Sequence, residues 1–170
     1  MDSSKPMRPA LKYYYRQSIG AFVYMAIVIF ILDCVSTQSF VWAVAITSIA
    51  SSACIVFTRP HAHAAEPRRM IWSYGLSIIV GYCFFHASTW MMPLIGHRLS
   101  VELFGAAAVG FFIFLIALLD FQHPPAVGVV FGFTIEPWHY QAVLVIAASV
   151  LALVMIHVLA KRRMRDLYLH

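Results

Sequence analysis

Long apolar runs separated by short polar stretches dominate this sequence. Each of these runs is close to the ~20 residues with which a helix crosses a hydrocarbon layer about 30 Å thick. The runs cover residues 18–35, 38–57, 71–92, 101–119 and 140–159. Helix is the expected state, because an isolated strand in lipid would leave its backbone polar groups unpaired. The pattern therefore predicts an all-α membrane protein with five to six transmembrane segments.

Composition supports the same class. Of the 170 residues, 62% are hydrophobic and only 11% are Asp, Glu, Lys or Arg, and the mean hydropathy is +0.81. A soluble domain carries about 25% charged residues, because water must wet its surface. We therefore exclude a soluble domain. The length of the chain fits a single membrane domain.

The stretch 120–139 (DFQHPPAVGVVFGFTIEPWH) does not read as one continuous helix. Pro124 and Pro125 lack a backbone donor and bias the preceding residues towards extended geometry. A short helix over 126–133 fits, with Pro125 near its first turn, and Pro137 closes the segment. The pattern leaves open a surface loop, a re-entrant half-helix or a broken crossing.

Charge distribution helps to choose between these alternatives. The net charge of +5 comes from basic clusters that flank the apolar runs. Clusters in these positions indicate contacts with lipid headgroups, and we expect no nucleic-acid partner. With five crossings, seven basic residues lie on one side and five on the other; with six crossings the division is eleven to one. Cytoplasmic loops are enriched in Lys and Arg, so we expect six segments with both termini cytoplasmic. About six extended and ten helical residues reach roughly 35 Å, enough to cross.

This division gives three parts: a basic N-terminus at 1–17, a transmembrane domain at 18–160 and a basic tail at 161–170.

Six segments also invite a search for a repeat. The small-residue run 49–53 followed by 57–61 is weakly similar to 125–129 followed by 133–139. Such a three-plus-three repeat would be inverted in the membrane, and chance similarity between small-residue helices is the alternative.

Two short motifs carry a family resemblance. His123-Pro124-Pro125-Ala126 and, about fifty-five residues earlier, Glu66-Pro67-Arg68-Arg69 resemble the two signature elements of the HPP family of integral membrane proteins. The resemblance covers roughly residues 20–160. The chain departs from the family pattern at Arg69, where Asn is usual, at Ser73-Tyr74, where Gly-His is frequent, and in the displaced Gly128. Family members in plastids and cyanobacteria look like nitrite transporters, and bacterial members suggest an inner-membrane location.

An anion pathway at the broken segment is the sharper hypothesis for these residues. The amides of Ala126, Val127 and Gly128 would point from a helix N-terminus towards the bilayer middle. Hydroxyls of the second segment would add donors, and His123 would couple its charge state to transport. The candidate binding residues are His123, Pro124, Pro125, Ala126, Gly128, Ser51, Ser52, Arg68 and Arg69, with Ser48 as a further hydroxyl donor.

Each of these features also has a structural interpretation. Small residues in membrane helices allow close packing, His123 can satisfy a carbonyl freed by the prolines, and Arg68 and Arg69 can anchor headgroups. His61 and His63 with Glu66 have no firm ligand spacing, so we expect no metal and no cofactor.

The sequence therefore predicts a transporter or channel for a small inorganic anion, nitrite-like by resemblance. The alternative is a membrane scaffold or sensory subunit that transports nothing. No nucleophile elbow, HExxH motif or helically spaced carboxylate pair is present, so we expect no enzyme. Six short helices make a thin wall for a pathway, which favours a homo-oligomer in the bilayer.

Overall fold

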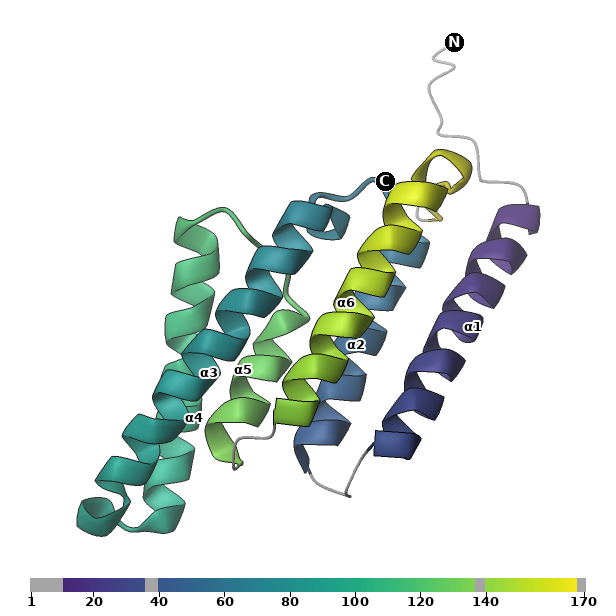
Figure 1. The fold of residues 1–170 in the computed structure, drawn as a ribbon. Coiled ribbons are helices and arrows are strands. Elements are labelled where there is room, and N and C mark those ends of the chain that lie inside the picture. The colour runs from purple at the N-terminus through teal and green to yellow at the C-terminus, as the bar shows by residue number, and fades with distance from the viewer. Residues whose placement is uncertain (1–10, 36–39, 137–139, 168–170) are drawn as a thin grey trace.

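The computed structural model describes residues 11–35, 40–136 and 140–167, which form a bundle of helices (Figure 1). The α-helices in this part of the chain are α1 (Leu11–Val35), α2 (Phe40–Thr58), α3 (Pro67–Ile95), α4 (His97–Leu118), α5 (Ala126–Ile135) and α6 (Tyr140–Ala160). Two 3-10 helices, η1 (His63–Ala65) and η2 (Lys161–Arg163), complete them. The described residues contain no strand, so the predicted all-α class is confirmed.

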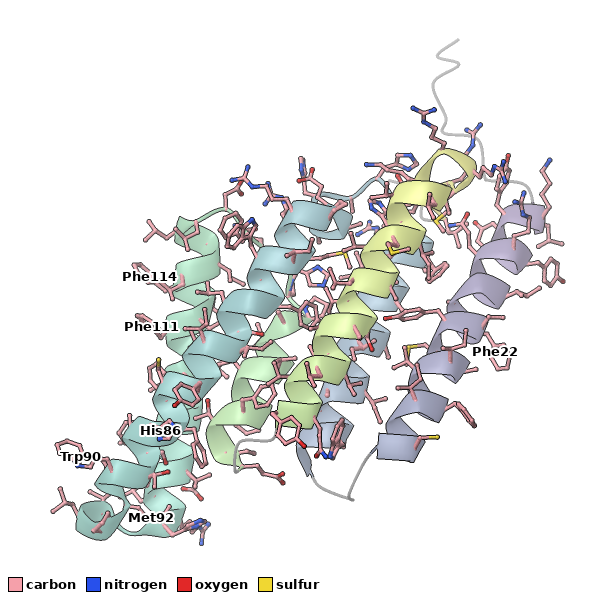
Figure 2. The ribbon with its side chains drawn as sticks, viewed as in Figure 1. Phe22, His86, Trp90, Met92, Phe111 and Phe114 are labelled. Atoms are coloured by element: carbon pink, nitrogen blue, oxygen red, sulfur yellow. The ribbon has the colours of Figure 1, made fainter. Side chains whose placement is uncertain are left out.

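Four helices are long and apolar enough to cross a membrane: α1, α3, α4 and α6. The described part of α2 and the whole of α5 are shorter apolar helices. Large apolar side chains cover the outside of the bundle, and Figure 2 shows Phe22, Phe111 and Phe114 pointing away from it. A surface of this kind is stable against lipid and not against water.

Helix α5 occupies the centre of the bundle. It packs against α2, α3 and α4, while α1 lies at one edge beside α2 and α6 (Figure 1). Both Val130 and Phe133 are almost fully buried. Gly81 of α3 and Gly128 of α5 leave room for these close contacts, which brings α5 into the middle of the bundle.

The bundle interior is rich in small hydroxyl side chains. The buried ones are Ser48, Ser52, Ser73, Ser77, Ser88, Ser100, Thr134 and Ser149. Between α3 and α4, for example, the hydroxyl groups of Ser88 and Ser100 are 3.0 Å apart. Helices in lipid associate through close packing of small residues and interhelical hydrogen bonds, and the buried hydroxyls provide both.

Three helices extend beyond the predicted segments. Helix α1 begins at Leu11 and not at 18, because Lys12 and Arg16 hold their charged groups in solvent while their stems continue the helix. Helix α3 begins at Pro67, a residue suited to the first helical position. Gly96 adopts a φ of 83° between α3 and α4, which glycine does at little cost, so α4 begins at once with His97.

The described ends of the chain meet at the end of the bundle that carries η1. The Tyr14 hydroxyl donates to the Leu167 carbonyl at 3.0 Å. The Gln17 side chain donates to the carbonyls of Phe57 and Arg165. Helix α1, the end of α2 and the segment after η2 are therefore tied together at one end of the molecule.

Candidate functional site

The broken segment begins with a specific helix stop. The amide of Phe121 donates to the Ile116 carbonyl at 2.9 Å, and that of Asp120 to the Ala117 carbonyl at 3.4 Å. This pair of bonds is a Schellman motif, which requires a left-handed residue after the helix. Asp120 fills that position with a φ of 56°, and Asp tolerates it better than most residues other than glycine. The chain therefore leaves α4 and turns back into the bundle.

An arginine fork fixes this turn. Both terminal nitrogens of Arg69 donate to the two Asp120 carboxylate oxygens, at 2.8 and 2.7 Å, and Arg69 Nε donates to Glu66 at 3.0 Å. The hydrogen bond from Arg69 lowers the pKa of Asp120 below its ordinary value. Arg69 is thus held by two carboxylates of its own chain, Glu66 and Asp120.

Arg68 lies beside this fork on the exposed surface. Its guanidinium stands over the Phe121 ring, 5.4 Å from the centroid, and Trp72 stacks on the same ring at 5.8 Å between centroids. Cation–π contact of this kind holds the side chain near the start of the broken segment. Arg68 remains available as a cation at this end of the bundle.

His123 is the buried polar centre of the segment. Its Nδ1 lies 2.6 Å from the Ala64 carbonyl oxygen and its Nε2 lies 2.7 Å from Ser52 Oγ. Because a carbonyl only accepts, Nδ1 carries a hydrogen. In the neutral imidazole Nε2 is then the acceptor, and Ser52 donates to it.

Tyr74 extends this network into α3. Its hydroxyl lies 2.7 Å from Ser52 Oγ and 3.0 Å from the Ser48 carbonyl oxygen. Because Ser52 gives its one proton to His123, Tyr74 is the donor in the contact with Ser52. The His123 and Tyr74 rings are tilted against each other with centroids 5.6 Å apart. Tyr74, Ser52 and His123 thus form a continuous chain of exchangeable protons, hereafter the polar cluster, buried between α2, α3 and the broken segment.

The start of α5 satisfies its own amides. Those of Ala126, Val127 and Gly128 donate to the carbonyls of His123, Pro124 and Pro125 at 3.1, 3.1 and 3.3 Å. The prediction that these three amides are free to meet a ligand is wrong for this conformation. The carbonyls of His123, Pro124 and Pro125 are the acceptors for the first turn of α5.

The remaining predicted residues divide into two groups. Pro125 and Ala126 are buried beside the polar cluster, and a Cβ added to Gly128 would overlap Ser48 Oγ, so Gly128 allows α5 to approach α2 closely. Pro124 and Ser51 are exposed. Ser51 lies on the outside of α2, one position from Ser52, and does not join the cluster.

Sequence reasoning missed Tyr74 as a member of the site. Its position falls on a stripe of buried residues along α3, with Met70, Ser73, Ser77 and Gly81. Polar and small residues at intervals of three and four in an apolar helix are the signal that marks such an inward face. Ser73 contributes as well, donating to the His123 carbonyl at 3.4 Å.

The polar cluster is closely packed. His123 and Ser52 have no exposed surface. A gap along α5, lined by residues that include Val44, Val129 and Ile146, has no room for a water molecule. This gap therefore has no space for a ligand in the present conformation.

Comparison with known families gives one finding. The model of the family described as "HPP, transmembrane region" matches residues 6–168, nearly the whole chain. Comparison with curated proteins and with solved structures gave no match.

Proposed function

The chain belongs to the HPP transmembrane family, and from this premise we propose that it moves a small monovalent inorganic anion, nitrite-like in its chemistry, across a membrane. The polar cluster is the proposed site. The observation that carries the proposal is a proline-broken segment that places His123 between the hydroxyl groups of two helices inside the bundle.

The proposal includes six crossings with cytoplasmic termini. The stretch between α4 and α5 descends from the η1 end of the bundle, and α5 continues to the opposite end (Figure 1). The two parts together act as one broken crossing. The three-plus-three repeat stays a prediction, in which α2 and α5 correspond; these two helices pack against each other where Ser48 meets Gly128.

The cluster suits an anion that travels with a proton. It contains one imidazole and two hydroxyls and no fixed charge, so binding a lone anion there would leave a charge uncompensated in a medium of low polarity. Protonation of His123 turns Nε2 into a donor and reverses the direction of the Ser52 hydroxyl. Proton and anion would then neutralise each other at the site.

Access from the η1 end requires movement of the broken segment. The Arg69–Asp120 fork holds the first residue of that segment, and Arg68 supplies an exposed cation next to it. We propose that the fork acts as the cytoplasmic gate and that Arg68 raises the local anion concentration. The closed packing around His123 then corresponds to the occluded arrangement.

Nitrite uptake into proteoliposomes, with and without an inward proton gradient, tests this proposal. The key variants are Ser52→Ala, Tyr74→Phe and His123→Ala, and Ser51→Ala is the matched control because its side chain faces outwards. Each of the first three removes a buried hydrogen bond. We expect uptake to fall about tenfold or more, since about 1.4 kcal/mol corresponds to a factor of ten.

Uptake that Ser52→Ala and His123→Ala leave unchanged would remove the polar cluster as the site. A wild-type protein that is folded and carries no nitrite or related anion would favour the non-transporting scaffold instead. We also propose that the protein is no enzyme: Ser52 donates to His123 as a nucleophile would to its base, but both side chains are completely buried, away from any substrate.

A further inference from the structure

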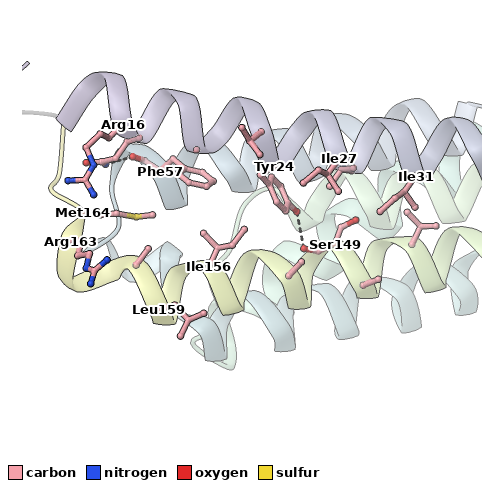
Figure 3. Close-up of a pocket in the computed structure, with 18 of the residues that line it drawn as sticks. Arg16, Tyr24, Ile27, Ile31, Phe57, Ser149, Ile156, Leu159, Arg163 and Met164 are labelled. Carbon is pink, nitrogen blue, oxygen red and sulfur yellow. Dashed lines mark hydrogen bonds between the residues drawn. The ribbon is translucent and has the colours of Figure 1, made fainter. Parts of the chain in front are cut away.

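A long groove separates α1 from α6 (Figure 3). Its volume is about 1060 Å³ and its walls are almost entirely apolar, with Val23 and Ile27 on α1 and Ile156 on α6. The helices touch across it where the Tyr24 hydroxyl donates to the Ser149 carbonyl at 2.9 Å. The lining runs from Tyr13 to Ile31 along α1, about 27 Å of helix axis.

One end of this groove is basic. Arg16 of α1 and Arg163 of η2 line it, and Figure 3 shows both side chains at the same end. Both residues are exposed. No carboxylate of the described chain forms an ion pair with either of them. The groove therefore has apolar walls along its length and, at one end, two cations that have no negative partner in the described chain.

We propose that this groove binds an anionic phospholipid, with the phosphate between Arg16 and Arg163 and an acyl chain along Val23 and Ile156. The basic end lies where the described chain ends meet, the side for which the charge distribution predicts the cytoplasm. Anionic lipids give that leaflet its negative surface potential, and basic sites between helices bind their headgroups. Acyl chains span half of the ~30 Å hydrocarbon layer, so the groove is long enough for one.

A second copy of the chain fits the groove less well. A helix docked there would need to bring a carboxylate to the two arginines, since buried charges are costly without a partner. Glu66, Asp120 and Asp166 are the described carboxylates at this end, and each already contacts a basic side chain of its own chain. The lipid phosphate supplies the missing charge without disturbing these pairs.

Native mass spectrometry of the purified protein tests the proposal. The probes are phosphatidylglycerol and phosphatidylcholine with identical acyl chains. We expect more phosphatidylglycerol adducts on the wild type, and a loss of about fivefold for each of Arg16→Gln and Arg163→Gln, because one Lys or Arg contributes about that factor near an anionic surface. Arg98→Gln is the control, because Arg98 pairs with Glu102 at the far turn.

A second pair of variants tests the apolar part. Ala148→Phe fills the groove, whereas Ala147→Phe adds the same ring to an exposed position that does not line it. Only Ala148→Phe should reduce binding, in protein that elutes as a folded species on size exclusion. Equal adducts of the two lipids with no effect of the arginines would overturn the proposal. So would a dimer that Ala148→Phe alone dissociates, because the occupant would then be a second copy.

Discussion

Asp120 combines a strained backbone conformation with a carboxylate that binds Arg69. Its left-handed φ of 56° is a conformation that glycine adopts more cheaply. Glycine at this position would complete the Schellman motif and leave Arg69 without its forked partner. The carboxylate of Asp120 therefore explains the residue type better than the backbone does, and it ties the broken segment to the first turn of α3.

Replacement of Arg69 tests this link through the pKa of Asp120. The hydrogen bond from Arg69 is the largest cause of the lowered pKa, so Arg69→Gln should raise it towards the ordinary value of about 3.9. A carboxyl whose pKa is lowered by folding stabilises the fold at pH values above its pKa in the unfolded chain. This contribution is lost as the pH falls through its pKa in the folded protein. Carboxyl ¹³C chemical shifts of Asp-labelled protein measure the change, with Arg98→Gln as the control. An Asp120 pKa that stays unchanged would contradict the role of the fork.

At the scale of residues, the sequence predicted His123 and Ser52 but not their partner. His123 stood out as part of a motif and Ser52 as a hydroxyl of the small-residue run, and the structure places His123 Nε2 2.7 Å from Ser52 Oγ. Ser51 was predicted to bind alongside Ser52, because the small-residue run of α2 does not indicate which of its residues face the bundle. Tyr74 was missed because it replaced an expected family residue, and only the packing of α3 against α2 shows that its hydroxyl reaches Ser48 and Ser52.

At the scale of elements, α5 depends on glycines of its neighbours. A Cβ added to Gly81 of α3 would lie 2.7 Å from the Phe133 Cβ and 3.2 Å from the Val130 carbonyl oxygen. Neither atom is the far end of a flexible side chain, so α5 itself would have to move. The sequence predicted a short helix over 126–133, and the observed helix ends two residues later, whereas its central place follows from three-dimensional packing alone.

Two glycines of the same helix provide a matched test of that packing. Gly81→Ala should destabilise the protein by about 1–3 kcal/mol, the usual cost of overpacking. Gly75→Ala should be neutral or stabilising by up to about 1 kcal/mol, because nothing lies within 4 Å of its added Cβ and alanine is the better helix former. Thermal unfolding in detergent measures both. Equal effects of the two substitutions would show that α5 does not rest closely on α3.

At the scale of the whole molecule, hydropathy predicted the all-helical membrane architecture. The four long helices were visible as apolar runs because a membrane span requires length and composition that few other elements have. The exact ends of these helices could not be predicted from hydropathy, since residues such as Lys12 and Arg16 can continue a helix into the headgroup region. The tie between α1 and the residues after η2 was also beyond the sequence, because Gln17 and Tyr14 bond to backbone carbonyls, which every residue offers.

The side on which each loop lies is the property of the whole molecule that the proposed pathway most needs. In a background without Cys34, Cys54 and Cys83, single cysteines at His63, Arg98 and Arg162 provide exposed reporters. If the broken segment crosses, His63→Cys and Arg162→Cys should react with a membrane-impermeant maleimide only from the cytoplasmic side, and Arg98→Cys only from the other. Labelling of positions 63 and 162 from opposite sides would mean that the chain between α4 and α6 returns to the side it entered from. His123 would then belong to a re-entrant loop, and an anion reaching it would still have half of the bilayer to cross.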